Sequence, residues 1–371
     1  RDSSTSRGLG DVYKRQLSPD AVKTSRDKMK IIYPPIHGSG YMPVTTMLER
    51  MGIPVETVPE QIAPDPDFST VRVPNPEEAD ALSLAVSLAE KENASVVIGT
   101  DPDCDRMGVA VRDDEGKFVL LNGNQTGVLL MDYILRRKKD EKTLSENAAV
   151  VKTIVSTRLA DCVAKDFGVT VFDVLTGFKF IGEKIKEWEE NGKYTFVFGF
   201  EESYGCLAGT HARDKDAVVA SMLFAEMACY EHSVGSSVYD RLKKIYEKYG
   251  FYLEKSFSFA FSGIDAMNRM AAVMDDIRKN PPEEVAGRKV LSVSDYLSGV
   301  TVFADKSTAP VTLPKSNVLY FALDNDAWIC VRPSGTEPKL KIYVATKEKS
   351  KDSAERDVSD MKNCIVKRFG L

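Results

Sequence analysis

The aspartates Asp101, Asp103 and Asp105 alternate within the sequence DPDCDR, directly behind an apolar run at residues 94–100. That run is short and rich in β-branched residues, which is typical of a buried strand. The carboxylates therefore lie on the loop at the carboxyl end of the strand, the edge at which open α/β sheets bind ligands. Carboxylates crowded on one tight loop repel one another, and a divalent cation relieves the repulsion. Mg²⁺ suits the loop because it prefers oxygen ligands.

The acidic loop has two other interpretations besides a magnesium site. One is a solvated acidic turn, because aspartate is common in turns. The other is a calcium loop of the EF-hand type, which needs Gly at position six and Glu at position twelve. Those positions hold Arg106 and Arg112, so the EF-hand is excluded and magnesium binding is the prediction.

Composition limits the classes of partner and compartment. The net charge of −5, with 50 Lys and Arg against 55 Asp and Glu, gives no support to nucleic-acid binding. No apolar run approaches the roughly 20 residues that span a bilayer, and the polar start has no apolar signal-peptide core. The 6 cysteines are scattered without a CxxC pair, which argues against a zinc site or a disulfide framework. We therefore expect a cytoplasmic protein without nucleic-acid or membrane partners.

The order of predicted elements indicates an α/β chain of three domains. Strand and helix patterns alternate through two consecutive mixed α/β units, and a smaller α+β region follows them. The Ser/Arg/Gly-rich start resembles translated adapter sequence and is predicted to be an artefactual or disordered tail. The predicted boundaries are 1–16 for the tail, 17–145 and 146–249 for the α/β domains, and 250–371 for the C-terminal domain.

A second loop with chemical potential is Gly199-Phe-Glu-Glu-Ser-Tyr-Gly205, which also follows a predicted strand. Its adjacent carboxylates, Glu201 and Glu202, and the hydroxyl of Ser203 suit recognition of vicinal sugar hydroxyls, which can donate to carboxylate oxygens. The alternative is an acidic turn that caps a helix, and the loop alone does not decide between them.

Two further segments could bind phosphate. Arg332 begins the sequence RPSGTEP between two predicted strands. Its planar fork matches phosphate geometry, and the following glycine can expose backbone N–H groups to an anion. The sequence fits neither the P-loop nor the dinucleotide pattern, and a plain hairpin turn is the alternative. In Thr176-Gly-Phe-Lys179 the lysine could face a phosphate at a helix start or could simply lie on the surface.

Taken together and in this order, these loops resemble the α-D-phosphohexomutase superfamily. DPDCDR is similar to its metal loop, usually DGDxDR, with Pro102 in place of the glycine. GFEESYG is similar to its sugar loop and RPSGTEP to its phosphate loop. The segments TGFK at 176–179 and RDKD at 213–216 also match segments around the active site of the family's third domain.

The sugar loop favours glucose phosphates within that superfamily. Glu-Glu-Ser at 201–203 is similar to phosphoglucomutases, whereas phosphomannomutases and phosphoglucosamine mutases usually have Glu-Met-Ser or Glu-Gln-Ser. Phosphopentomutase-like relatives often lose the serine. The alternatives kept open are a phosphomannomutase, a phosphopentomutase and a non-catalytic sugar-phosphate-binding protein.

The resemblance has one large departure. The family has four domains, and the first carries a phosphorylated serine in a motif such as TASHNP or SASHNP. No such motif is present in this chain, so its three predicted domains match the family's second, third and fourth. We therefore expect a phosphoglucomutase fragment that is inactive alone because the catalytic serine is missing.

The resemblance also implies roles, a cofactor and an intermediate. The intact enzyme interconverts glucose 1-phosphate and glucose 6-phosphate through the phosphoserine and glucose 1,6-bisphosphate, with Mg²⁺ as cofactor, as a monomer or weak homodimer. The residues expected in these roles are Asp101, Asp103 and Asp105 for the metal; Thr176, Gly177, Glu201, Ser203, Arg332, Ser334, Gly335 and Thr336 for the phosphosugar; and Arg106 and Lys179 near the transferring phosphate.

Overall fold

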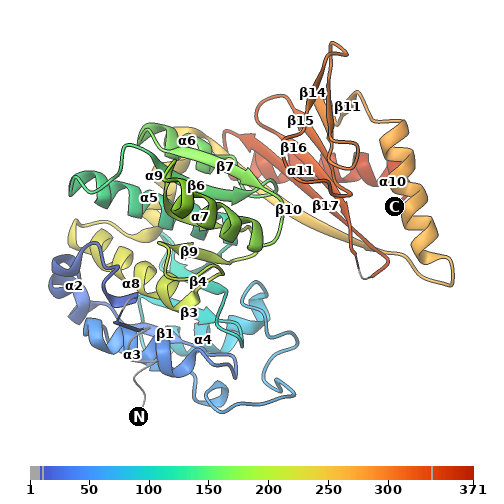
Figure 1. The fold of residues 1–371 in the computed structure, drawn as a ribbon. Coiled ribbons are helices and arrows are strands. Elements are labelled where there is room, and N and C mark those ends of the chain that lie inside the picture. The colour runs from blue at the N-terminus through green and yellow to red at the C-terminus, as the bar shows by residue number, and fades with distance from the viewer. Residues whose placement is uncertain (1–8, 11, 336) are drawn as a thin grey trace. The chain divides into compact units, whose positions relative to one another are not determined.

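The computed structural model describes residues 9–10, 12–335 and 337–371. The chain divides into two compact units, residues 1–245 and 246–371 (Figure 1). No helix in the described part of the chain is long and apolar enough to cross a membrane. Each unit is described by itself below.

The first sheet of the first unit has five strands and supports the acidic loop. Its strands are β1 (Ile31–Tyr33), β2 (Val55–Thr57), β3 (Val96–Thr100), β4 (Met107–Arg112) and β5 (Phe118–Leu121). They run in the order β2-β1-β3-β4-β5. β1 is parallel to β2 and β3, while β4 and β5 are antiparallel additions. All five residues of β3 are buried, as expected for a central strand packed on both faces.

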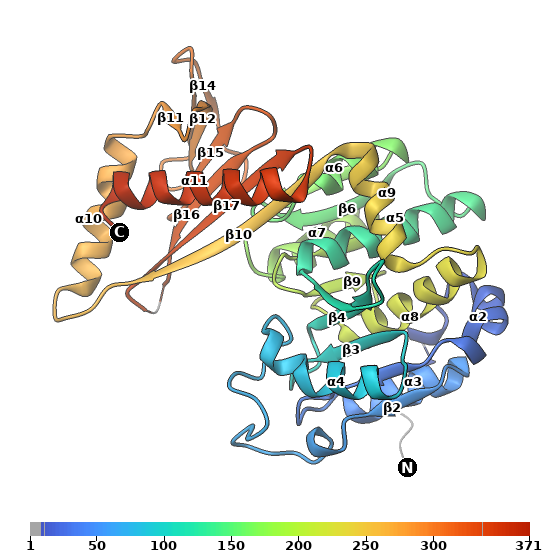
Figure 2. The same ribbon diagram turned by 180° about the vertical axis from the view of Figure 1, so that it is seen from behind.

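Helices cover this sheet (Figures 1 and 2). Those near it are α2 (Pro19–Ser25), α3 (Tyr41–Met51) and α4 (Ala79–Lys91), with short 3₁₀ turns at Arg26–Lys28 and Pro59–Gln61. α4 buries small residues such as Ala85 and Ala89 against Ile32, Val97 and Ala110 of the strands. Small side chains at helical spacing allow the helix to approach the sheet closely.

The second sheet has four strands in the order β7-β6-β8-β9. Its elements are α5 (Gly123–Asp140), β6 (Ala148–Thr153), α6 (Leu159–Asp166), β7 (Thr170–Val174), α7 (Lys179–Asn191), β8 (Thr195–Phe200) and β9 (Cys206–Ala208). β6 is parallel to β7 and β8, and β9 returns antiparallel to β8. The loops after β6, β7 and β8 therefore share the carboxyl edge of the sheet, where functional loops are expected.

Two more helices follow: α8 (Ala217–Ser233) lies in the first unit, and α9 (Val238–Tyr249) begins in it and ends just past the boundary at residue 245. Asp216 caps α8 by accepting from the backbone N–H groups of Val218 and Val219 at 2.8 and 3.0 Å. α8 is buried on nearly all sides, because it contacts α2, α3 and β4 around the first sheet as well as α5 and β9 of the second half. A helix that is apolar all round belongs in a core.

The second unit is an antiparallel sheet with two helices, α10 and α11, on one face (Figure 2). Its elements are β10 (Phe251–Ala260), α10 (Ala266–Lys279), β11 (Glu284–Val285), β12 (Arg288–Asp295), β13 (Val300–Phe303), β14 (Thr308–Pro310), β15 (Leu319–Leu323), β16 (Trp328–Pro333), β17 (Lys339–Glu348) and α11 (Lys351–Phe369). The strand order is β10-β17-β16-β15-β12-β13-β14, with β11 paired to β12. The predicted fold class, two mixed α/β sheets followed by an α+β region, is confirmed.

The segment expected to be a tail has some described structure. Leu9 and Val12 are buried, with 8% and 5% of their surfaces exposed, while residues 1–8 and 11 lie outside the described part. Leu17 and Ser18, which follow it, donate their backbone N–H groups to the buried carboxylate of Glu226 at 2.8–3.0 Å. The chain is thus anchored to α8 at the start of the first predicted domain.

Candidate functional site

The acidic loop between β3 and β4 brings the predicted metal ligands together. One carboxylate oxygen each from Asp101, Asp103 and Asp105 lies within 4.8 Å of the others. Oδ1 of Asp101 accepts from the backbone N–H groups of Asp105 at 3.0 Å and Arg106 at 2.9 Å. Asp101 thus holds the backbone of the loop with Oδ1, while its Oδ2 takes no part in these two hydrogen bonds.

The charge on this loop is incompletely compensated by the protein. Oδ1 of Asp105 is buried without a hydrogen-bond partner, and Nε of Arg106 lies 3.7 Å from it and from Oδ2 of Asp101. Burial raises the pKa of Asp101 to about 7 against the lowering effect of the Arg106 N–H, and the charges of Asp105 and Asp103 add to the rise. An all-carboxylate donor set with an orphaned buried oxygen fits a hard divalent cation such as Mg²⁺.

Mg²⁺ binding should weaken as the pH falls below about 7, since the pKa of Asp101 is raised to that value. A protonated carboxyl must lose its proton before it can coordinate the cation, so the apparent Kd should rise by up to about tenfold per pH unit on the acid side. Calorimetric titration of MgCl₂ into the chain at about pH 8 and about pH 6 measures this. Equal affinity at both values would contradict it.

A turn at residues 38–40 packs against the acidic loop at Pro102. Ser39 donates its backbone N–H and its Oγ hydroxyl to the carbonyl of Pro102 at 2.8 and 3.0 Å. A Cβ on Gly38 would overlap the backbone of Pro102, and one on Gly40 would overlap the hydroxyls of Tyr33 and Thr100. Glycine is therefore required by close approach at both positions, and the space left by Gly38 accommodates the proline.

Lys215 contacts the acidic loop but was not among the predicted site residues. Its Nζ lies 2.8 Å from Oδ2 of Asp105 and 3.1 Å from Oδ1 of Asp214. Its stem packs so tightly over Gly205 that a Cβ there would overlap it. Burial lowers the pKa of Lys215, but the hydrogen bonds and charges of Asp105 and Asp214 outweigh burial and raise it, so the ammonium stays charged. The sequence signal was the alternating RDKD before an apolar helix.

The predicted sugar loop follows β8 and turns one carboxylate toward the loop after β7. Oε1 of Glu201 accepts from the backbone N–H of Gly177 at 2.9 Å, and the Glu201 side chain is largely buried. Burial raises the pKa of Glu201, against the lowering effect of the Gly177 N–H. Glu202 turns inward and accepts from Oγ1 of Thr153 at 2.9 Å. Ser203, which follows Glu202 in the loop, is partly exposed.

The acidic loop and the sugar loop are joined through their backbones. Arg106 and Gly205 form an antiparallel bridge, and the N–H of Met107 donates to the carbonyl of Tyr204 at 3.1 Å. Asp105, Lys215 and Glu201 consequently belong to one continuous site within the first unit. Arg106, with 38% of its side chain exposed, also lies 3.6 Å from Oε1 of Glu77.

Two further predicted residues, Lys179 and Thr176, lie close to Gly177 in the chain and are more exposed than Glu201. Lys179 is the first residue of α7 and is exposed, with Nζ 4.9 Å from the ring centroid of Phe180. Thr176 is partly exposed beside Gly177. The role predicted for Lys179 near a transferring phosphate stays a prediction, and Lys215 is a second lysine in the region, which reaches the acidic loop directly.

The predicted phosphate loop is the turn between β16 and β17 in the second unit. The N–H of Ser334 donates to the carbonyl of Lys339 at 2.7 Å, and the N–H of Glu337 donates to Oγ of Ser334 at 3.3 Å. Gly335 is exposed, and nothing lies near its missing side chain. Thr336 lies outside the described residues. The turn thus presents an open backbone next to the partly exposed Arg332.

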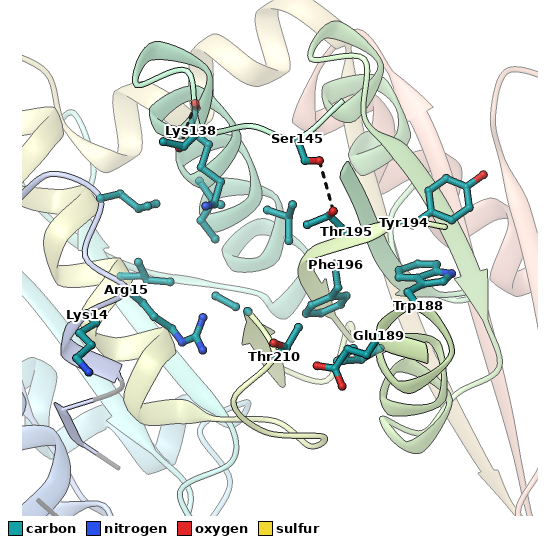
Figure 3. A pocket seen from close by; sticks show the side chains of 18 of the residues that line it. Lys14, Arg15, Lys138, Ser145, Trp188, Glu189, Tyr194, Thr195, Phe196 and Thr210 are labelled. Carbon is teal, nitrogen blue, oxygen red and sulfur yellow. Dashed lines mark hydrogen bonds between the residues drawn. The ribbon is translucent and has the colours of Figure 1, made fainter. Parts of the chain in front are cut away.

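The first unit also has a hollow of about 540 Å³ that contains none of the predicted site residues. Trp188 and Glu189 of α7, Thr195 at the start of β8 and Thr210 line it, and Lys138 and Arg15 reach its rim (Figure 3). It lies at the amino end of β8, whereas the sugar loop follows the carboxyl end. Concavity alone is a weaker argument than converging polar groups, so the acidic loop is taken as the functional site.

Known proteins resemble this chain over most of its length. Family models for phosphoglucomutase/phosphomannomutase match residues 11–116 (alpha/beta/alpha domain II), 122–249 (alpha/beta/alpha domain III) and 271–359 (C-terminal domain). A phosphoglucomutase from Staphylococcus aureus (strain MSSA476) is 34% identical over 357 residues, which are 96% of this chain and 63% of that protein. The chain thus spans less than two thirds of the length of that relative.

Solved structures share the fold. Parafusin, a phosphoglucomutase from Paramecium in an open form, is 18% identical with a TM-score of 0.68, over 98% of this chain and 61% of its own. N-acetylphosphoglucosamine mutase from Aspergillus fumigatus, in complex with GlcNAc-6P and magnesium, is 14% identical with a TM-score of 0.53, over 94% of this chain and 64% of its own. With three consecutive family domains matched, the chain belongs to the phosphoglucomutase/phosphomannomutase family of the α-D-phosphohexomutase superfamily.

Proposed function

We propose that the chain carries the metal-, sugar- and phosphate-binding parts of a phosphoglucomutase that interconverts glucose 1-phosphate and glucose 6-phosphate. The observation that supports this most is the continuity of the acidic loop and the sugar loop, which are joined by the bridge between Arg106 and Gly205. A cation site and a carboxylate suited to sugar hydroxyls are thereby held side by side. The phosphoglucomutase relative at 34% identity supports the choice of reaction.

The residues of the first unit have distinct roles in this proposal. Asp101, Asp103 and Asp105 would hold Mg²⁺, which when bound offsets negative charge on a phosphoryl group. Lys215 orients the Asp105 carboxylate through the 2.8 Å ion pair and keeps a fixed positive charge beside it. Arg106 supplies a second cation at the mouth of the loop. Preorganised charges of this kind act without reorganisation during the reaction.

Glu201 and Ser203 would hold the sugar. The buried Glu201 is fixed by the N–H of Gly177 through one oxygen, so its other oxygen is the one available to a sugar hydroxyl. The Ser203 hydroxyl can donate or accept. The Glu-Glu-Ser sequence makes glucose phosphates the proposed substrates, while mannose or pentose phosphates, or binding without catalysis, are the alternatives.

Phosphate binding is proposed for the loop in the second unit. Arg332, Ser334, Gly335 and Thr336 would hold the phosphate that does not transfer, and glucose 1,6-bisphosphate would be the intermediate. Turnover in this scheme needs a phosphoserine, and the sequence contains no TASHNP or SASHNP motif. We therefore propose that this chain binds phosphosugars but does not turn them over alone. A cytoplasmic location and a monomeric or weakly dimeric state complete the proposal.

Calorimetry should detect binding of glucose 1,6-bisphosphate in the presence of Mg²⁺. The Arg332→Ala change should remove most of this binding. Loss of a desolvated, hydrogen-bonded charge contact costs on the order of 2–5 kcal/mol of binding free energy. Circular dichroism of the variant is the folding control. No binding by the unaltered chain would count against the proposed function, and unchanged affinity in the variant would remove Arg332 from the site.

Activity separates the enzyme from the non-catalytic alternative. Fusing a first domain of this family, with its phosphoserine motif, ahead of residue 17 should give mutase activity with Mg²⁺ and glucose 1,6-bisphosphate. A matched fusion with Ala in place of the phosphorylated serine is the control. A folded fusion that binds the bisphosphate but does not interconvert the two glucose phosphates would favour a non-catalytic binding protein.

A further inference from the structure

The sugar loop contains one carboxylate to which the proposed function gives no role. Glu202 lies between Glu201 and Ser203 in the chain, but its Oε2 accepts a hydrogen bond from the hydroxyl of Thr153 at 2.9 Å. Thr153 is the last residue of β6, and 0% of its surface is exposed. One oxygen of the Glu202 carboxylate is therefore held inside the protein, at the carboxyl end of the neighbouring strand.

The hydrogen bond to Glu202 is the end of a chain of buried hydroxyl groups. Oγ of Ser156 lies 2.9 Å from Oγ1 of Thr153, and Ser156 is 1% exposed. Thr153 has one hydroxyl proton, which it donates to Glu202, so Ser156 is the donor to Thr153. Buried polar groups are costly to leave without a partner, and the chain of hydroxyls therefore fixes where the Glu202 side chain lies.

The backbone directly after Ser203 is strained. Tyr204 has a φ of 69°, in the left-handed region that residues with a Cβ seldom adopt. Such a conformation persists only where the surroundings hold it. The N–H of Met107 in β4 donates to the carbonyl of Tyr204 at 3.1 Å, and Gly123 of α5 packs so closely that a Cβ on it would overlap the Tyr204 nitrogen. The sugar loop is thus held by β4 and α5 as well as by β6.

We propose that Glu202 is a positioning residue, which fixes the hydroxyl of Ser203 for sugar binding and is itself held by Thr153. This inference rests on the proposed function, in which Ser203 holds a sugar hydroxyl. Ser203 lies between the anchored side chain of Glu202 and the strained backbone of Tyr204, so its position is set from both sides. Without the anchor, the strain at Tyr204 would relax and move the Ser203 hydroxyl. A loop that is ordered in advance loses less conformational entropy when the ligand binds.

The test removes the anchor at a residue outside the sugar loop. Thr153→Val deletes the hydroxyl and keeps the shape of the side chain, whereas Thr153→Ser keeps the hydroxyl. Calorimetry with glucose 1,6-bisphosphate and Mg²⁺ on the full chain should show an affinity about tenfold weaker for Thr153→Val and nearly unchanged for Thr153→Ser. MgCl₂ alone should bind Thr153→Val as tightly as the unaltered chain, because the acidic loop keeps its three carboxylates.

Thr195→Val is the matched control within the same sheet. The hydroxyl of Thr195 also donates to a side chain, Asn147, at 2.9 Å, but Thr195 is the first residue of β8, whereas the sugar loop follows the last. The affinity of this control for the bisphosphate should be unchanged.

A double-mutant cycle tests whether Glu202 and Thr153 act together. Glu202→Leu removes the acceptor and should weaken bisphosphate binding by the same factor as Thr153→Val. The variant with both changes should bind no more weakly than either single variant, because the first change already breaks the anchor. Independent contributions, in which the two factors multiply, would contradict a role for Glu202 that depends on Thr153.

Hydrogen exchange gives a second measurement, which needs no ligand. In Thr153→Val the backbone N–H groups of residues 201–205 should exchange roughly tenfold faster, while those of the acidic loop should be unchanged. The inference is overturned if Thr153→Val binds the bisphosphate as tightly as the unaltered chain, or if exchange in the sugar loop does not change. If the unaltered chain does not bind the bisphosphate while Thr153→Val still loosens the loop, the proposed function fails, and the sugar-positioning role of Glu202 falls with it.

Discussion

Replacing Asp101 by Asn should weaken Mg²⁺ binding by roughly a hundredfold or more while leaving the acidic loop folded. The amide oxygen can still accept the backbone N–H groups of Asp105 and Arg106, which the carboxylate now accepts at 3.0 and 2.9 Å. The negative charge that binds the cation is lost, however. Calorimetric titration with MgCl₂ measures the change.

The same Asp101→Asn change should stabilise the metal-free chain at neutral and alkaline pH. Because the pKa of folded Asp101 is raised to about 7 from 3.8, ionising it costs folding free energy as the pH rises through that interval, and the cost is complete above it. The variant should gain on the order of 1–3 kcal/mol of unfolding free energy near pH 8 and nothing near pH 3. Asp67→Asn, at an exposed carboxylate outside the loop, is the control. Unchanged Mg²⁺ affinity would remove Asp101 from the metal site.

Asp132→Ala should destabilise the first unit by about 3–5 kcal/mol, because it removes a buried carboxylate that binds two partly buried arginines. Asp132 of α5 is 2% exposed and accepts from Arg136 at 2.9 Å and from both Nε and Nη2 of Arg241 in α9 at 2.7 and 2.6 Å. Arg136 keeps Glu231 as a second partner, but Arg241 loses the carboxylate that fixes both of its nitrogens.

The two tryptophans allow the effect to be assigned to one unit. Trp188 lies in the first unit and Trp328 in the second, so a Trp328→Phe background makes fluorescence report the first unit alone during urea unfolding. Asp114→Ala is the matched control, since Asp114 also binds a cation of α9, Lys243, but its side chain is 63% exposed. The control should cost at most about 1 kcal/mol. Equal effects of the two changes would contradict the argument from burial.

Local sequence was enough to predict where the three candidate loops lie, because each follows a strand. The acidic loop after β3, the sugar loop after β8 and the turn between β16 and β17 are contiguous segments whose chemistry is visible residue by residue. The strand before each loop is marked by apolar or β-branched residues. Three short strands, β9, β11 and β14, were not predicted, because they are two or three residues long and lack the consecutive β-branched residues that mark a strand such as β1.

Residues that act across the fold could not be predicted in the same way. Lys215 reaches Asp105 over 110 positions of sequence, and only the packing of its stem over Gly205 explains the direction that it takes. The sequence of the RDKD segment marked the neighbourhood of Lys215 but not the contact.

The burial of α8 affects how far the chain can be treated as modular. Although α8 falls within the segment matched by the third family domain, it packs against α2, α3 and β4, which lie within the second. Separating the two segments near residues 117–121 would expose an apolar surface on both halves and remove β5 from β4. The boundary between the two family domains therefore does not separate two pieces that pack independently. The smallest piece that can be exchanged between homologues without repacking is both segments together.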